Sequence, residues 1–170
     1  EDNIIGTAFM PYVQNVAGLT SVNYRAEPYK FREEQGCSLG KIFQPCAVDK
    51  PEDPITPLIE AHAGDAIRIH VIGANSEQNG MFGVEGHEWP IEPYMPGADM
   101  ISVVEYAGSE TLDVFIRGGA GGPYRQVGDF VWSNARLPYT QSGQWGYLRV
   151  LPAGDSRIQP LGAAGMGAKQ

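Results

Sequence analysis

Residues 57–72 read PLIEAHAGDAIRIHVI, and this stretch decides the fold class. From residue 66 onward apolar and polar side chains alternate, which places three apolar residues on one side of an extended chain: Ile67, Ile69 and Val71. A period of two predicts a β-strand that turns one face toward a core. The Ala-Gly-Asp sequence at 63–65 is typical of a turn, so residues 57–61 are expected to form a separate strand before it.

Outward from this stretch, the chain keeps short apolar runs separated by Gly, Pro and Asn. Its 170 residues include 22 Gly and 13 Pro, and they show no sustained apolar pattern at helical spacing. Further strands are expected at 81–85, 100–106, 111–117, 130–132 and 147–151. Many short strands with Gly- and Pro-rich connections predict an all-β fold, a Greek-key β-sandwich.

Three regions differ in composition. Residues 1–56 contain only short apolar runs and a proline-containing linker, and they are expected to form an irregular extension that packs on the sandwich. Residues 57–152 hold the regular pattern and are expected to form the sandwich domain. Residues 153–170 are rich in Gly and Ala and predict a flexible tail, unless a partner orders them.

The formal net charge of −8 argues against nucleic acid as a partner, because phosphate binding needs clustered Lys and Arg. No apolar stretch reaches the roughly 18 residues of a membrane-spanning helix. The chain begins with Glu1 rather than Met. It is therefore expected to be either a processed product or a fragment of a longer protein, and the sequence leaves both open.

The two cysteines, Cys37 and Cys46, lie in one loop-like segment. A disulfide between them would stabilise that loop by about 2–3 kcal/mol, because it restricts the unfolded chain. Two free thiols are the alternative, and metal ligation is least favoured because no matching His or Cys pair accompanies them. A disulfide would favour an exported protein, located in the periplasm, at the cell surface or outside the cell.

Three separated stretches carry a resemblance to a known family. They are residues 57–69, residues 82–90 (FGVEGHEWP) and residues 128–150, which begin with GDF and end with GQWGYLRV. In order and spacing they resemble the cupredoxin domains of multicopper oxidases, above all the last domain of the large manganese-oxidase-like members. The resemblance covers the regular part of the chain and implies a cupredoxin-type β-sandwich.

The copper chemistry of that family lies at two of these stretches. The first usually reads His-Pro-Phe-His-x-His-Gly-His, and its three copper-binding histidines fall on Gly80, Gly83 and Glu85. Only the last, non-coordinating histidine has a counterpart, His87. The second usually reads His-Cys-His, followed by a further His and an axial Met, and here these positions hold Ser133, Asn134, Ala135, Tyr139 and Gln144.

A blue-copper centre requires a thiolate and two imidazoles, and no Cys follows Cys46. The resemblance therefore implies a domain that keeps the framework without type 1 copper. No cofactor is expected in this domain, and copper would belong to the parent assembly if that assembly is an oxidase. No catalytic residue is expected either, since no His is paired with a nucleophile in a recognisable motif.

A different metal site has three candidates: His87 with the nearby Glu85 and Glu88. Imidazole and carboxylate together suit Zn, Mn or Cu, but the preferred interpretation is that His87 bonds to the backbone of its turn. His62 and His70 are expected to be a partly exposed turn residue and a cross-strand partner of a carboxylate. Aromatic-rich loops provide contact candidates for a neighbouring domain or subunit: Tyr94, Met95, Tyr124 and Tyr139.

Two functions follow from this sequence. The preferred one is a non-catalytic structural domain or subunit that packs against other cupredoxin domains or subunits in a multicopper-oxidase-type assembly. Such a parent assembly would oxidise a metal ion or an organic reductant with O2, while this domain alone would not be an enzyme. The alternative is a secreted metal-binding or self-assembling β-sandwich protein that uses His87, Glu85 and Glu88.

Overall fold

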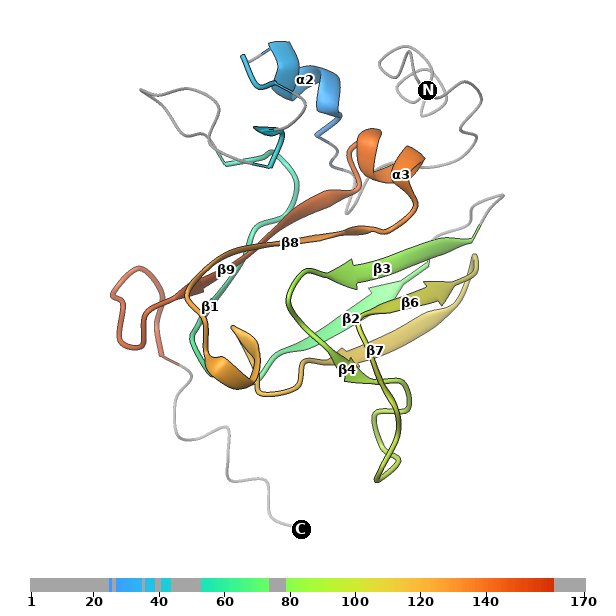
Figure 1. The fold of residues 1–170 in the computed structure, drawn as a ribbon, viewed down its shortest axis with the longest axis vertical. Helices are drawn as coiled ribbons and strands as arrows, with labels where there is room; N and C mark the ends of the chain where they lie inside the picture. Colours follow the sequence, from blue (N-terminus) through green and yellow to red (C-terminus); the bar gives the residue numbers. More distant parts are fainter. Residues whose placement is uncertain are drawn as a thin grey trace.

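The computed structural model describes residues 25, 27–34, 36–38, 41–43, 53–73 and 79–160. Nearly all regular structure in these residues is β (Figure 1). The strands are β1 (Ile59–His62), β2 (Arg68–Ile72), β3 (Gly80–Val84), β4 (Trp89–Pro90), β5 (Met100–Ile101), β6 (Val103–Tyr106), β7 (Thr111–Phe115), β8 (Gly128–Asn134) and β9 (Trp145–Leu151). Two short α-helices, α2 (Tyr29–Glu34) and α3 (Leu137–Gln141), and a 3-10 turn, η2 (Gly122–Tyr124), complete the set.

The strands form a main sheet and a smaller sheet that packs on it. The main sheet has the order β1-β9-β8-β3-β6, in which β1 and β9 run parallel and the other neighbours antiparallel. The smaller sheet pairs β2 with β7, and a short β4–β5 pair lies beside it. Along the chain the strands pass from the main sheet to β2, back to β3 and β6, across to β7 and back to β8. This alternation between sheets is the Greek-key sandwich expected from the sequence.

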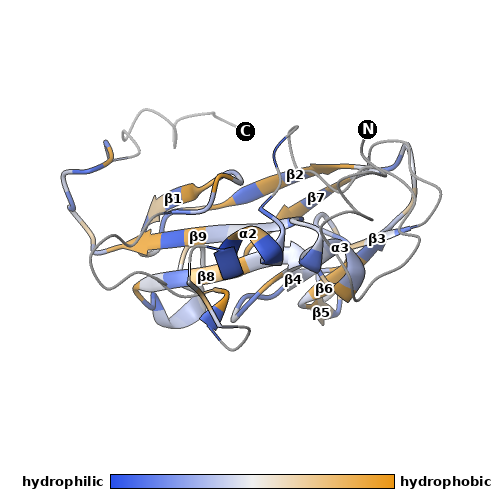
Figure 2. Cartoon of the chain, turned by 90° about the horizontal axis from the view of Figure 1, so that it is seen from above, coloured by the Kyte–Doolittle hydropathy of each residue, from blue (hydrophilic) through white to orange (hydrophobic). Residues whose placement is uncertain are grey.

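The core lies between the two sheets (Figure 2). It contains Val114 from β7, Trp132 from β8 and Leu148 from β9, and Ile69 and Val71 of β2 pack against it. The alternation predicted for residues 67–71 is thus confirmed. Ile69 and Val71 of β2 point inward, and Arg68 and His70 are exposed. Pairing of these inward faces removes apolar surface from water, which is the main stabilising contribution.

Two glycines of the main sheet each face a large aromatic ring on the neighbouring strand. Gly80 pairs directly with Tyr106, and Gly146 pairs directly with Trp132. A side chain added at either glycine would overlap the opposite ring. These aromatic rings therefore cover the space that glycine leaves open, as in the aromatic rescue of strand glycines.

A second, smaller cluster lies on the opposite face of the main sheet. Residues of the N-terminal segment, including Cys37 and Ile42, pack there against Val131 of β8 and Trp145 and Tyr147 of β9. Figure 2 shows α2 in front of β8 and β9. The described part of the expected extension therefore packs on the sandwich.

The N-terminal segment differs from the expectation in one respect. The charged stretch 29–34, predicted to be irregular, forms the helix α2. Lys30 and Glu34 are spaced i,i+4 on its exposed side, with 4.0 Å between the ammonium and carboxylate. Arg32 points inward and is only 2% exposed. Burial of one face against the sheet explains a six-residue helix that propensity alone would not sustain.

An ion-pair network fixes the segment that leads into β1. Arg149 of β9 bonds to Asp129 of β8 through Nε (2.8 Å) and to Asp53 through Nη1 (3.0 Å). Side-chain hydrogen bonding to Arg149 lowers the pKa of Asp53. The Arg149 guanidinium thus links β9 and β8 to Asp53, which lies shortly before β1.

The C-terminal region that was expected to be flexible is described as far as residue 160. Residues 153–155 form a turn in which Asp155 N–H donates to Pro152 O, and His62 Nε2 lies 2.8 Å from the Asp155 carbonyl. His62 is 5% exposed, so it is a buried residue rather than the partly exposed one expected. Residues 161–170 lie outside the described residues, and flexibility of the tail stays a prediction.

Candidate functional site

Four of the positions that the resemblance aligns with copper ligands come together where β8 turns through α3 into β9. They are Gly80, Asn134, Tyr139 and Gln144. Asn134 ends β8, Tyr139 lies in α3, and Gln144 directly precedes β9. Gly80 begins β3, and the following Met81 N–H donates to Asn134 Oδ1 over 3.1 Å. The positions identified from the sequence therefore converge, although none of them carries a metal-binding imidazole or thiolate.

Asn134 and Gln144 form a buried amide pair at the centre of this region. Asn134 Nδ2 donates to Gln144 Oε1 over 2.8 Å, and both residues are under 10% exposed. Asn134 Oδ1 accepts from the backbone N–H of Arg136 (3.1 Å) as well as from Met81. Asn134 therefore satisfies backbone donors on both sides of the loop, which a buried loop requires.

The fourth position is filled by an aromatic ring. A side chain at Gly80 would overlap the Tyr106 ring, so Tyr106 occupies the space where a ligand at that position would lie. Burial, with a smaller contribution from the nearby Tyr139, raises the pKa of Tyr106. Tyr139 is 3% exposed, and its hydroxyl has no hydrogen-bond partner among the described residues. The Arg136 guanidinium lies 5.1 Å from the centre of its ring.

The residues present do not fit a type 1 copper. Copper of this kind is held by a Cys thiolate and two His imidazoles, with a weak axial ligand. Here the corresponding groups are two amides that bond to each other, a phenol and a glycine covered by tyrosine. Two amides that bond to each other are poor copper ligands, but their hydrogen bond holds the two ends of the loop together.

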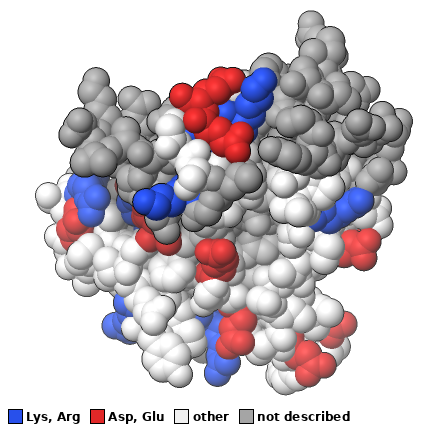
Figure 3. Space-filling model, turned by 45° about the horizontal axis from the view of Figure 1, so that its top comes forward, with Lys and Arg blue, Asp and Glu red and all other residues white. Residues whose placement is uncertain are grey.

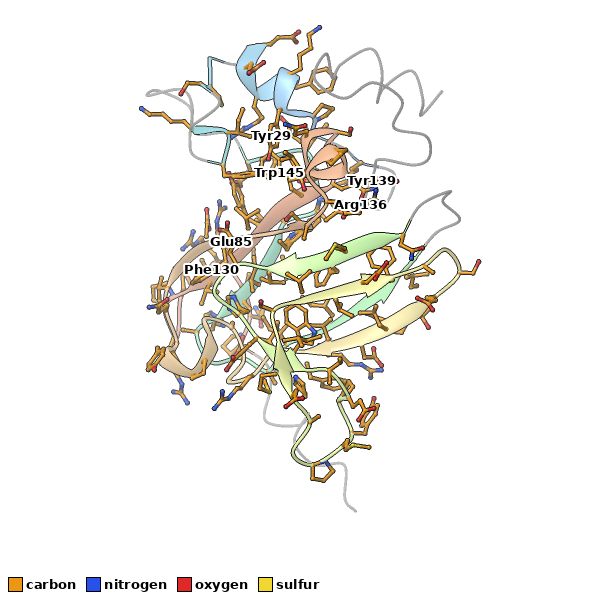
Figure 4. All side chains as sticks on the ribbon, turned by 45° about the vertical axis from the view of Figure 1, so that its right-hand side comes forward. Tyr29, Glu85, Phe130, Arg136, Tyr139 and Trp145 are labelled. Carbon is orange, nitrogen blue, oxygen red and sulfur yellow. The ribbon has the colours of Figure 1, made fainter. Side chains whose placement is uncertain are left out.

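The remaining positions, Gly83, Glu85, Ser133 and Ala135, lie along the neighbouring ends of β3 and β8. Gly83 pairs directly with Ser133. By alternation they share the face of Val131 rather than that of Trp132. Glu85 and Ala135 are exposed there, so the N-terminal segment does not cover all four positions. Figure 4 shows Glu85 and Phe130 farther along the sheet than Trp145 and Tyr29, with Tyr139 and Arg136 on the side of α3.

Tyr29 of α2 lies close enough to this face to interact with Glu85. Burial, with a smaller contribution from the Glu85 carboxylate, raises the pKa of Tyr29 from 10.0 to about 12. Both causes disfavour the phenolate. The unfolded chain therefore releases this proton at lower pH than the folded protein.

We expect the Y29F variant to lose less stability at alkaline pH than the wild-type protein. Between about pH 10 and about pH 12 the unfolded state alone loses the Tyr29 proton, so the free energy of unfolding falls as the pH rises. Urea denaturation at several pH values in this window measures the slope. The slope should be shallower in Y29F but not zero, because burial also raises the pKa of Tyr106 and Tyr147. An unchanged slope would contradict burial of the Tyr29 hydroxyl.

His87 is a structural residue of the turn after β3. Its Nδ1 lies 2.7 Å from the Glu85 carbonyl oxygen, and its Nε2 accepts the Gly121 N–H over 3.1 Å. Since a carbonyl only accepts and an N–H only donates, the ring must carry its proton on Nδ1. It is 3% exposed and meets Phe130 edge to face at 4.7 Å. His87 thus fixes the glycine-rich loop at residues 118–122 to this turn.

Glu85 and Glu88 do not join His87 in a metal-binding group. Glu85 is exposed, and Glu88 forms an ion pair with Arg117. Across residues 53–73, 79–160 and the described N-terminal residues, no three His, Cys, Asp or Glu side chains are placed to hold a metal ion. A metal at His87 would have to displace the hydrogen bond from Gly121.

His70 is the cross-strand partner of a carboxylate that the sequence predicts. Its Nδ1 lies 2.7 Å from Asp113 Oδ1, and the Arg68 guanidinium bonds to the same carboxylate. Hydrogen bonds from Arg68 and His70 lower the pKa of Asp113 to about 2. On the face shown in Figure 3, acidic and basic side chains likewise lie near one another. His70 thus shares the Asp113 carboxylate with Arg68 at the surface.

Three of the four contact candidates are exposed, and one is not. Tyr94, Met95 and Tyr124 are 77%, 58% and 86% exposed. The loop that carries Tyr94 and Met95 projects away from the sheets (Figure 1). Tyr139 is buried because α3 turns its ring inward beneath Arg136, so it is not available for contact with a partner.

The cysteines are only partly described. Cys37 is 5% exposed and belongs to the cluster on the outer face of the main sheet. No cysteine is free among the residues that the structure describes. Cys46 lies outside those residues, so a Cys37–Cys46 disulfide stays a prediction. No described helix is long and apolar enough to cross a membrane.

Comparison with known proteins adds structural neighbours but no sequence relatives. No family model and no curated protein matches the chain. Among solved structures it is similar to the 2F4 variant of the McoA multicopper oxidase from Aquifex aeolicus (15% identity, TM-score 0.47, 64% of this chain and 23% of that chain). It is also similar to the multi-copper oxidase from Pediococcus acidilactici (13%, 0.47, 59% and 22%) and the Blue Copper Oxidase from Nitrosomonas europaea (19%, 0.47, 57% and 31%). The chain thus spans less than a third of each of these proteins.

Overlap at this level does not by itself establish a common fold, and the assignment rests on the chain's own strands. The order β1-β9-β8-β3-β6, the parallel β1–β9 pair and the β2–β7 sheet across the core define the sandwich. The convergence of Gly80, Asn134, Tyr139 and Gln144 agrees with the resemblance seen in the sequence. The chain is an all-β Greek-key sandwich.

Proposed function

We propose that the chain is a non-catalytic structural cupredoxin domain or subunit of a multicopper-oxidase-type assembly. The observation that supports this most directly is the Asn134–Gln144 hydrogen bond in the region of the copper-ligand positions. The Tyr106 ring fills the space beside Gly80, so side chains occupy this region. A framework held together in this way needs no metal to be stable.

The parent assembly, in this proposal, oxidises a metal ion or an organic reductant with O2 by means of copper bound in other domains. Such an assembly would be exported. This chain would contribute shape and contacts through exposed loop residues such as Tyr94, Met95 and Tyr124. Electrons would not pass through its own ligand positions.

A role as an independent metal-binding sandwich has less support. It depends on His87, whose two ring nitrogens already bond to Glu85 and Gly121. We therefore retain the structural role as the proposal.

The metal content of the purified chain tests the proposal. After incubation with Cu(I) or Cu(II) and removal of loosely bound ions, we expect far less than one copper per chain and no intense visible absorption. The Q144M variant is a matched control, because it removes the amide pair without supplying a thiolate, and it should also stay colourless. Stoichiometric copper with a strong visible band in the wild-type protein would contradict the proposal.

A further inference from the structure

Arg125 is the only arginine in residues 53–73 and 79–160 whose guanidinium forms neither an ion pair nor a hydrogen bond with a described residue. Each of the others bonds to a carboxylate or a carbonyl group: Arg68, Arg117, Arg136, Arg149 and Arg157. Arg125 is exposed. Its guanidinium is therefore an unpaired cation on the surface of a chain with a net charge of −8.

Arg125 lies in the loop that contains the 3-10 turn, residues 118–128, which we call the η2 loop. This loop is fastened to two neighbouring turns by backbone hydrogen bonds. Ala120 is fully buried, and its N–H donates to the Asp65 carbonyl over 2.8 Å. The Gly121 N–H donates to His87 Nε2 over 3.1 Å. A loop fixed in this way loses little conformational freedom when a partner binds.

The tip of the η2 loop presents the cation beside two exposed apolar side chains. Tyr124 is 86% exposed and Val127 is 54% exposed. Arg125 has a φ of 50°, which is uncommon for a residue other than glycine. Its side chain lies over Gly64, where an added Cβ would meet Arg125 Nε at 3.0 Å. Such strained residues cluster at ligand contacts, and Tyr and Arg are enriched at the centres of protein interfaces.

A second exposed loop carries the opposite charge. Residues 91–99, which we call the β4–β5 loop, contain Glu92 and Asp99, both exposed and without a side-chain bond to any described residue. Tyr94 packs edge to face on Phe115 of β7 at 5.6 Å and stays 77% exposed. The other large exposed side chains of this loop are apolar: Ile91 and Met95.

The two loops lie at the same end of the sandwich, away from α2 and α3. Figure 1 and the turned view of Figure 4 both place the orange coil of η2 and the loop after β4 at the lower side of the ribbon. One end of the molecule thus combines an unpaired cation with unpaired carboxylates, each among exposed apolar side chains. Two copies related by a two-fold axis can bring each loop against its counterpart twice.

Long-range repulsion between two acidic chains does not prevent such a contact. At physiological ionic strength, repulsion between exposed charges is screened beyond about 8 Å. Glu88, which lies just before the β4–β5 loop, is already paired with Arg117. The charges that remain for an interface at this end are therefore Arg125 on one loop and Glu92 and Asp99 on the other.

We propose that this end of the sandwich binds the same end of a second copy of the chain. The η2 loop of each copy contacts the β4–β5 loop of the other, and Arg125 pairs with the carboxylates of Glu92 and Asp99. The inference goes beyond the proposed function and does not depend on it, because copper content and association between copies are measured separately.

Sedimentation velocity of the full chain over a range of concentrations tests the inference. The wild-type protein should pass from monomer to dimer as its concentration rises, and R125E should weaken the dimer at least ten-fold. R125N should weaken it as well, since asparagine tolerates a positive φ and removes the charge. The matched control is K30E, which makes the same change in charge on α2 and should associate like the wild type.

Reversing the charges on both loops identifies the contact. R125E alone and E92R/D99R alone should each be mainly monomeric, whereas the R125E/E92R/D99R variant should dimerise again, because the ion pairs re-form with opposite polarity. Circular dichroism establishes that each variant is folded. A wild-type protein that stays monomeric would overturn the inference, and so would an R125N dimer of wild-type strength or a triple variant that stays monomeric.

Discussion

Substituting five residues, as G80H, Y106A, N134C, Y139H and Q144M together, is expected to give a chain that binds a single type 1 copper. The variant should show the intense visible absorption of a copper–thiolate bond. The four positions already converge, since the side chains of Asn134 and Gln144 touch and Met81, next to Gly80, donates its N–H to Asn134. The change at Tyr106 is needed because its ring overlaps any side chain at Gly80.

The control for this experiment keeps everything except the sulfur. The same variant with N134S in place of N134C has nearly the same shape but no thiolate, and it should not show the visible band. Circular dichroism establishes that both proteins are folded. A folded N134C protein that binds no copper would contradict the convergence of these four positions in the loop between β8 and β9.

The strands were predictable because alternation is a local property. In residues 66–72 each apolar residue is two positions from the next, so the chain reveals its inward face without knowledge of its neighbours. The short pairs are a different case. β4 consists of Trp89 and Pro90 alone, and two residues have no period to detect. The helix α3 was also missed, because Pro138 and Tyr139 carry no helical pattern over five residues.

The contacts that hold the loop between β8 and β9 could be predicted only in part. The resemblance aligned Asn134 and Gln144 with copper ligands, but nothing local shows that their amides bond to each other across the loop. The role of Tyr106 was missed altogether. The available signal was Gly80, since a strand glycine needs a large cross-strand neighbour to cover it, but identifying that neighbour requires the register of β3 and β6.

The packing of the N-terminal segment on β8 and β9 is the part of the fold that sequence patterns reveal least. Residues 27–43 have no alternation, and their structure follows from contacts made at long range: the Glu27 carbonyl and the Trp145 indole are 118 positions apart. Tertiary packing decides such segments, and their intrinsic propensity is only a weak guide. A buried arginine such as Arg32 is a further obstacle, because composition alone assigns it to the surface.

Trp145 is therefore expected to be the most sensitive single residue of the outer face. It is 0% exposed, it contacts Phe43 and Tyr147, and its indole N–H anchors Glu27. The W145A variant should lose about 3–5 kcal/mol of unfolding free energy, because it leaves a large cavity between the sheet and the N-terminal segment. Urea denaturation followed by circular dichroism measures the loss.

The W145F variant separates the ring from the hydrogen bond. Phenylalanine keeps an aromatic ring against Phe43 and Tyr147 but leaves the Glu27 carbonyl without its indole donor, which should cost about 1–3 kcal/mol. W145F is thus expected to lie between wild type and W145A. If W145F were as unstable as W145A, the hydrogen bond to Glu27 rather than the packed ring would hold the N-terminal segment on the sheet. If W145A cost less than about 1 kcal/mol, residues 27–43 could not be packed on β9 as a tightly fitted layer, since removal of a fully buried tryptophan from such a contact cannot be cheap.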